Sequence, residues 1–143
     1  MKIKPVILDR IQTKHTNYIV DLKLEENVTF ITGDSGTGKS AVYSFLEEYA
    51  SEDKRIRCFN YLDYNKGYKA SIRNSKGKLF VIDNADILLD DKLRKRIVLD
   101  SVNQFIIIGR NPTELLLSQD EIYELDHSER DGVTWFTLKK AFY

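Results

Sequence analysis

The stretch Val28-Thr29-Phe30-Ile31-Thr32-Gly33-Asp34-Ser35-Gly36-Thr37-Gly38-Lys39-Ser40 decides the fold that the sequence predicts. A short apolar run, typical of a buried strand, leads directly into Gly-x-x-x-x-Gly-Lys-Ser, and a helical pattern follows. In this context the loop can turn its backbone N–H groups inward as an anion-binding nest, and the helix N-terminus adds its positive end. We therefore expect a triphosphate site here; the alternative is a coincidental glycine-rich turn.

Each position of this loop has an expected role. Gly33 and Gly38 permit backbone angles that a side chain would forbid, and Gly36 eases close approach. Lys39 is expected to reach the β- and γ-phosphate oxygens, and the Ser40 hydroxyl to ligate Mg²⁺. The residues expected to contact the nucleotide are Gly33, Asp34, Ser35, Gly36, Thr37, Gly38, Lys39, Ser40 and Ala41.

A second signature lies further along the chain, where the apolar run Leu79-Phe80-Val81-Ile82 ends in Asp83. A parallel strand buried on both faces reads as such a continuous apolar run. A carboxylate at the carboxyl end of this strand is expected to meet the Mg²⁺ shell beside the loop. Ser40 and Asp83 are 43 positions apart, which leaves room for a helix, one strand and a connector. Ser40 and Asp83 are thus the expected metal ligands.

Composition limits the alternatives. The 143 residues predict a single domain over 1–143, and 42% apolar with 31% charged residues is typical of a soluble globular protein. Lys plus Arg equals Asp plus Glu at 22 each, so net charge does not indicate a nucleic-acid partner. The single cysteine, Cys58, excludes an internal disulfide. No apolar run approaches the ~18 residues of a membrane span, so we expect a cytoplasmic protein without membrane contact.

Hydrophobic periodicity predicts the remaining elements. Strands are expected at 5–11 and 18–24, forming a hairpin around the turn 12–17, and at 28–32, 55–59, 79–82 and 105–109. A second hairpin is expected from strands 121–125 and 133–138 around the turn 126–132. Helices are expected at 39–50, 90–102 and 114–118, the last capped by Thr113. Phe45 and Tyr49 of the first helix are expected to pack in the core and not to stack on a base.

Residues 60–78 form the least regular segment. Tyrosines alternate there with lysines and arginines, a combination that can bind a nucleic-acid backbone and stack on bases. The same composition also occurs in a solvated connector with a short helix, which we favour. Nucleic-acid binding through residues 60–78 is kept as an open alternative.

Taken together, residues 28–40, 79–86 and 105–112 resemble the additional-strand branch of phosphate-loop NTPases, most of all the core of AAA-type ATPases. The resemblance covers roughly residues 28–125. It implies an α/β, three-layer P-loop NTPase fold with a mainly parallel central sheet and antiparallel hairpins at the N- and C-terminal ends. In that family a polar residue after the next strand positions the attacking water, and Asn111 matches it. Arg110 beside it is a candidate γ-phosphate sensor.

The sequence also departs from this family. The family has Asp-Glu at the acidic motif, with the glutamate activating water, whereas this chain has Asp83-Asn84. Asp86 is the nearest remaining carboxylate and can replace the glutamate only if its loop turns inward. Few residues follow the last core strand, so the helical lid and its arginine are absent from the sequence.

These features leave three hypotheses for function. The first is a small Mg²⁺-dependent ATPase with Lys39, Asp83, Asp86 and Asn111 as catalytic residues, which needs a protein partner or a second copy to supply an arginine. The second is a nucleotide-gated binding and assembly module with vestigial hydrolysis. A small-molecule kinase is the third, although its arginine-rich lid and acceptor segment are not recognisable.

Overall fold

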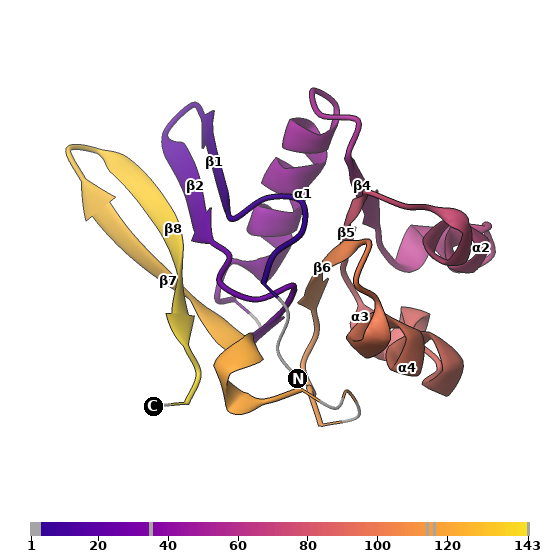
Figure 1. Cartoon of the computed structure of the whole chain (residues 1–143). Helices are drawn as coiled ribbons and strands as arrows, with labels where there is room; N and C mark the ends of the chain where they lie inside the picture. Colours follow the sequence, from indigo (N-terminus) through magenta and orange to yellow (C-terminus); the bar gives the residue numbers. More distant parts are fainter. Residues whose placement is uncertain (1–3, 35, 114, 116, 143) are drawn as a thin grey trace.

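The computed structural model describes residues 4–34, 36–113, 115 and 117–142. It is an α/β protein with one eight-stranded mixed sheet in the order β1-β2-β8-β7-β3-β6-β5-β4 (Figure 1). The strands are β1 Arg10–His15, β2 Tyr18–Lys23, β3 Val28–Thr32, β4 Ile56–Phe59, β5 Leu79–Ile82, β6 Gln104–Ile108, β7 Ile122–Arg130 and β8 Val133–Lys140. The helices are α1 Lys39–Ala50, α2 Tyr68–Asn74, α3 Ala85–Leu88 and α4 Asp91–Leu99, with 3₁₀ turns η1 Tyr61–Asp63 and η2 Gln119–Glu121.

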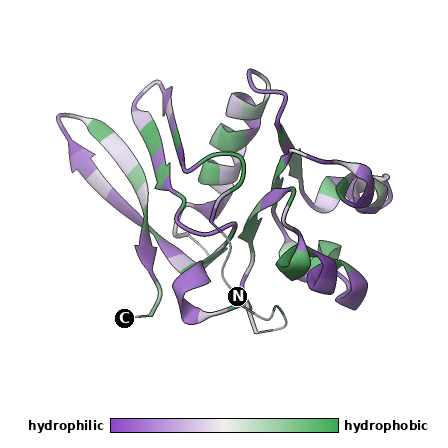
Figure 2. Ribbon diagram, viewed as in Figure 1, coloured by the Kyte–Doolittle hydropathy of each residue, from purple (hydrophilic) through white to green (hydrophobic). Residues whose placement is uncertain are grey.

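Five strands, β7-β3-β6-β5-β4, run parallel and form the central part of the sheet. Every residue of β5 and β6 is buried, as expected for strands covered on both faces. Figure 2 shows β5 as largely hydrophobic, whereas β1 and β2 alternate between hydrophobic and hydrophilic residues. Because β6 pairs with both β3 and β5, the carboxyl ends of these three strands meet at one edge.

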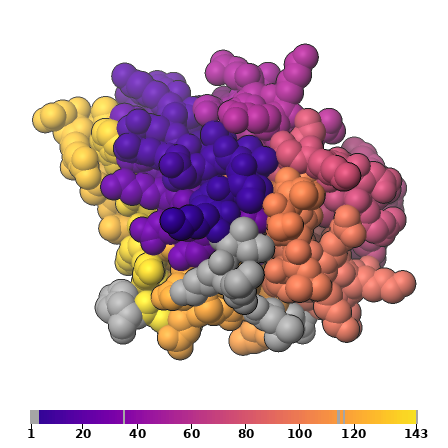
Figure 3. Space-filling view, viewed as in Figure 1, coloured from indigo at the N-terminus to yellow at the C-terminus, as the bar shows by residue number. Residues whose placement is uncertain are grey.

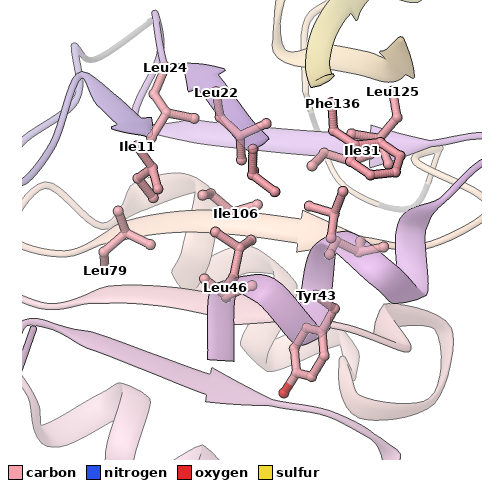
Figure 4. Packing of buried hydrophobic residues seen from close by; sticks show 14 of the residues in the cluster. Ile11, Leu22, Leu24, Ile31, Tyr43, Leu46, Leu79, Ile106, Leu125 and Phe136 are labelled. Atoms are coloured by element: carbon pink, nitrogen blue, oxygen red, sulfur yellow. The ribbon is translucent and has the colours of Figure 1, made fainter. Parts of the chain in front are cut away.

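Two hydrophobic clusters cover the two faces of the sheet. On one face, Val42 and Leu46 of α1 belong to one cluster with Ile31 and Ile106. Figure 4 shows Leu46 of this cluster close to Ile106. On the other face, residues of α2, α3 and α4 pack around Phe80 and Phe105, whose rings stack at 5.7 Å between centroids. Helix α1 spans the residues expected for it. Phe45 and Tyr49 lie half-buried against the first cluster.

Hairpins from the N- and C-terminal ends of the chain lie side by side on one flank of the sheet. The parallel pairing of β2 with β8 joins them, with Val20 opposite Phe136. The sheet is strongly curled, and in Figure 1 the β1–β2 hairpin lies between α1 and the β7–β8 hairpin. In Figure 3 the N-terminal residues lie between the C-terminal hairpin and the segment around β6.

The structure corrects both predicted hairpin turns. Residues 12–15 belong to β1, not to a turn, and the chain reverses at Thr16-Asn17, where Thr16 has φ 48°. Likewise β7 continues to Arg130, and the reversal occurs at Asp131-Gly132 with φ 53° and 79°. Asp-Gly is a strong signal for a two-residue hairpin turn because both positions tolerate positive φ. Both turns were predicted too long, because polar residues of β1 and β7 were assigned to the turns.

Two further expectations concern the C-terminal half. The helix expected at 114–118 includes residues that lie outside the described part of the chain, and the nearest described helical turn is η2. Helix α4 is shorter than expected, beginning after Asp90, whose carboxylate accepts a hydrogen bond from the Leu93 N–H at 2.8 Å. Over the described residues, none of the helices is both long and apolar enough to cross a membrane.

Buried amides fasten the N-terminal segment to the sheet. Gln104 on β6 is fully buried; its side-chain oxygen accepts hydrogen bonds from the N–H groups of Ile7 and Leu8 at 3.0 and 2.8 Å. Its amide group donates to the Leu8 carbonyl at 2.8 Å. Asn27 similarly binds the Val6 N–H and the Asn103 carbonyl. These bonds hold residues 6–8 against the edge of the sheet that lies opposite the phosphate loop.

Gln104→Leu is predicted to lower the free energy of unfolding by about 1–3 kcal/mol, because it leaves part-buried backbone groups of Ile7 and Leu8 without their partner. Urea unfolding followed by circular dichroism measures the change. The control is Gln12→Leu at an exposed position of β1, for which we expect a change within about 0.5 kcal/mol. Equal stability of the two variants contradicts the prediction.

Candidate functional site

The loop between β3 and α1 depends on glycines with left-handed backbone angles. Gly33, Gly36 and Gly38 have φ of 136°, 87° and 99°. A Cβ atom at Gly38 would also lie 2.7 Å from Cε1 of Phe136, so this position excludes a side chain on two grounds. A Cβ at Gly36 would meet no described atom within 4 Å, so within the protein Gly36 is required for its backbone angle. The close approach expected for this glycine stays a prediction.

Lys39 begins α1 and folds back over this loop. Its ammonium group donates a hydrogen bond to the Gly33 carbonyl. Burial lowers the pKa of Lys39, as does the positive charge of Arg110, and the nearby carboxylates of Asp83, Asp34 and Asp86 act in the opposite direction. The ammonium therefore lies in a partly desolvated position, where an anionic ligand would stabilise its charge.

Asp83 lies at the carboxyl end of β5, as the apolar run predicted. Its N–H donates to the Phe59 carbonyl at 2.8 Å, which continues the pairing with β4. Burial raises the pKa of the Asp83 carboxyl, against the effect of the hydrogen bond from the Asn84 N–H at 2.8 Å and of the Lys39 charge. The site thus contains a carboxylate whose charge is incompletely compensated by the protein.

Asn84 occupies the position at which the AAA-type ATPases that the sequence resembles have a glutamate. Its backbone is left-handed, with φ 53°, a conformation in which Asn is enriched among non-glycine residues. Its side-chain oxygen accepts a hydrogen bond from the Tyr61 N–H at 3.1 Å, which ties η1 to the end of β5. The side-chain oxygen of Asn84 is therefore bonded to the segment between β4 and α2.

Asp86, in the first turn of α3, faces the end of β6. Its Oδ2 accepts a hydrogen bond from the Arg110 N–H at 3.3 Å. Gly109 makes this approach possible, because a Cβ there would lie 3.1 Å from the Ala85 Cβ and 3.2 Å from the Phe30 ring. Asp86 is exposed and turned toward the same cavity as Asp83.

One cavity of about 480 Å³ brings most of the expected residues together. It is lined by the loop and the first turn of α1, by the segment after β5 and by the end of β6. The lining residues are Gly36, Gly38, Lys39, Ser40, Ala41, Asp83, Asn84, Asp86, Ile108, Gly109 and Arg110. An adjoining cavity of about 500 Å³ is lined by Thr32, Gly33, Asp34, Arg110 and Glu124.

Some expected residues lie elsewhere. Asn111 is not among the described residues that line the cavity beside Lys39 and Asp83; its side-chain oxygen accepts hydrogen bonds from the N–H and hydroxyl of Thr113 at 3.0 and 2.6 Å. The Thr37 hydroxyl donates to the Asp34 carbonyl within the loop, at 2.9 Å. Ser35 lies outside the described residues.

Glu124 was not anticipated from the sequence. It pairs in register with Thr32 across the parallel β7–β3 ladder, which places its carboxylate beside the start of the loop. Only the strand register brings these two residues together, so local sequence carried no signal for it.

The segment 60–78 divides into packed and exposed tyrosines. Tyr68 is buried, and its hydroxyl donates to the Leu88 carbonyl at 2.5 Å. Tyr61 and Tyr64 are more than half exposed. Lys69 forms an ion pair with Asp90 at 2.8 Å. Of the three tyrosines in this segment, two are therefore exposed to solvent.

Oxygen donors suited to Mg²⁺ are present in the cavity beside Lys39, namely the Ser40 hydroxyl and the Asp83 carboxylate. Within the described residues there is no group of three or more His, Cys, Asp or Glu side chains that could hold a metal alone. Magnesium in phosphate-binding proteins uses one or two protein ligands together with ligand phosphates and water. The donor set therefore fits a cation that arrives with a phosphorylated ligand.

Comparisons with known proteins add no assignment, since neither a protein-family model nor a curated protein matches the chain significantly.

Asp83→Asn is predicted to stabilise the protein at pH 7 in buffer without nucleotide or Mg²⁺. Burial raises the pKa of Asp83 above its ordinary value of 3.8, so the stability associated with the neutral carboxyl is present below that value and is lost as pH rises through the folded-state pKa. Asparagine keeps the acceptor for the Asn84 N–H without the charge.

Urea unfolding of both proteins between pH 4 and pH 7 measures this effect. The stability difference between Asp83→Asn and wild type is expected to shrink as pH falls toward 4. A variant that is less stable than wild type at pH 7 would contradict the assignment of Asp83 as an incompletely compensated charge.

Proposed function

We propose that this protein binds Mg-ATP and belongs to the additional-strand branch of P-loop NTPases, with a layered core similar to that of AAA-type ATPases. The observation that carries the proposal is the single cavity that joins Gly38, Lys39 and Ser40 to Asp83 at the carboxyl ends of neighbouring strands. Its volume of about 480 Å³ lies within the range of small-ligand pockets, roughly 300–1,000 Å³.

The strand order supports the branch. In the additional-strand branch, another strand separates the loop strand from the acidic strand. Here β6 lies between β3 and β5 in the sheet, and β4 lies between them in the sequence. Helices on both faces of the parallel strands agree with the same architecture.

Each residue of the cavity has a role in binding. The amides of the Gly33–Ser40 loop and the N-terminus of α1 bind the phosphates. Lys39 exchanges the Gly33 carbonyl for phosphate oxygens, which compensates its desolvated charge. Ser40 and Asp83 hold Mg²⁺, which when bound neutralises charge on the phosphates. Binding of the cation in turn stabilises the Asp83 carboxylate.

Lys39→Ala is predicted to weaken Mg-ATP binding by roughly 10-fold or more, since a hydrogen bond to a charged partner contributes about 1.5–3 kcal/mol. Isothermal titration calorimetry measures the change. Lys95→Ala on the exposed face of α4 is the matched control and should bind as wild type does. Equal affinity of Lys39→Ala and wild type would remove the basis of the proposal.

Hydrolysis is proposed to be slow. Asn84 cannot act as a general base, and its side chain is bonded to the Tyr61 N–H. Asp86 lines the cavity and is the carboxylate best placed to orient the attacking water, with Asn111 retained as the residue expected from the resemblance. Efficient turnover also requires an arginine from a protein partner or a second copy. Nucleic acid is a further candidate partner through residues 60–78.

The Asn84 bond also favours the second candidate, a nucleotide-gated binding and assembly module with vestigial hydrolysis. In that function ATP occupancy changes the state of the loop and of η1, which Asn84 connects to β5. Binding is then retained with negligible turnover, and oligomeric state or partner affinity depends on nucleotide.

Asp86→Asn separates the two candidates. For an ATPase that uses Asp86 as a base, turnover is predicted to fall by roughly 10²–10⁴-fold with ATP affinity within a few fold, because asparagine keeps the acceptor for the Arg110 N–H. Phosphate release under saturating Mg-ATP measures this, with Lys39→Ala as the background. Wild-type turnover equal to that background favours the binding module, and unchanged turnover in Asp86→Asn excludes Asp86 as the base.

A further inference from the structure

An aromatic cluster lies beside the phosphate loop and comes from elements outside the loop itself. Phe136 on β8 contacts Gly38, where it occupies the space that a side chain would take. The Tyr18 ring, at the start of β2, stacks on Phe136 with 6.1 Å between centroids and an interplanar angle of 18°. The Tyr18 ring also packs against the Phe45 ring of α1, with 5.4 Å between the ring centroids. The Tyr18 ring is therefore connected to the loop backbone through one intervening ring.

Tyr18 is the exposed member of an otherwise buried row. Residues 18, 20, 22 and 24 alternate along one face, and Val20, Leu22 and Leu24 are at most 2% exposed. Tyr18 is 42% exposed. Leu24, at one end of the row, therefore lies in the core, whereas Tyr18, at the other end, is exposed to solvent. The Tyr18 end is the one that lies toward Gly38, through Phe136.

The remaining rings of the cluster fix the orientation of Tyr18. Phe45 is half-buried and stacks on His15 at 4.4 Å, and Phe136 is 7% exposed. The His15 ring is in turn paired with the Glu48 carboxylate. These contacts make Phe45 and Phe136 supporting residues, in agreement with the core role expected for Phe45, and they hold Tyr18 in place while it stays 42% exposed.

We propose that Tyr18 is a stacking platform for the base of the nucleotide whose phosphates the loop binds. The inference rests on the proposed function and adds the base subsite to it. In this arrangement the ribose and base extend from Gly38 and Ser40 past Phe136, toward the flank where β2 pairs with β8. An exposed, oriented aromatic ring at that position offers a flat surface to a purine.

Stacking has a defined specificity. Every base has a π-face, so a stacking platform holds purine rings without reading their exocyclic groups. The ligand class is therefore a purine nucleoside triphosphate, and ATP and GTP are expected to depend on Tyr18 alike.

The test compares ligands with and without a base. Wild type, Tyr18→Ala and Tyr18→Phe are titrated by calorimetry with Mg-ATP, Mg-GTP and magnesium tripolyphosphate. Tyr18→Ala is expected to weaken binding of both nucleotides by roughly 5- to 150-fold and to leave tripolyphosphate binding unchanged. Tyr18→Phe keeps the ring and should bind as wild type does. The matched control is Tyr64→Ala, which removes another exposed tyrosine and should change nothing.

Three results would overturn the inference. Unchanged nucleotide affinity in Tyr18→Ala removes the platform, and so does wild-type affinity for tripolyphosphate equal to that for ATP; in both cases the phosphate site stands. Equal weakening of all three ligands by Tyr18→Ala means that the ring only supports the loop through Phe136. Failure of wild type to bind any of the three ligands, by contrast, overturns the proposed function itself.

Discussion

The pairing of β6 with both β3 and β5 is the interaction on which the site depends. The register sets Ile31 opposite Ile108 and Ile82 opposite Ile107, so the three strands end at nearly the same level. The loop leaves β3 at that level, Asp83 follows β5, and Gly109 follows β6. A slip of one residue in either ladder would turn alternate side chains to the opposite face and separate Asp83 from Lys39. Continuous burial of β5 and β6 on both faces makes such a slip costly.

Charge at this edge works against folding, and the rest of the chain offsets it. Burial raises the pKa of Asp83 and lowers that of Lys39, so both groups are held in positions that disfavour their charged forms. The compensation is spatially separate: hydrophobic clusters lie on both sheet faces, and the amide bonds of Asn27 and Gln104 secure the opposite edge. Stability thus resides in the sheet and its far edge, which leaves the loop edge able to gain favourable interactions from an anionic ligand and its cation.

Local signals in the sequence predicted the central elements well. Strand β3 and helix α1 have the expected bounds, and Asp83 ends β5 as the apolar run indicated. Residues defined by distant pairing were not predictable: Glu124 reaches the loop through the β7–β3 register, and Phe136 reaches Gly38 through the curl of the sheet. The hairpin turns were misplaced because β1 and β7 carry polar residues on exposed faces, where alternation with buried residues is weak. Gln104 was missed since a polar residue in an apolar run gives no sign of its partners.

Backbone conformation explains why the acidic motif ends in asparagine. At φ 53°, residue 84 turns the chain sharply from β5 into α3, and α3 then presents Asp86 to the end of β6. Glutamate is disfavoured in this left-handed region, whereas asparagine is tolerated there. The Asn84 side-chain oxygen also accepts a hydrogen bond from the Tyr61 N–H. A longer side chain at this position would need a different conformation to make the same bond. The geometry that brings Asp86 into the cavity is therefore the geometry that disfavours glutamate at position 84, so the asparagine at this position and the approach of Asp86 have a common cause.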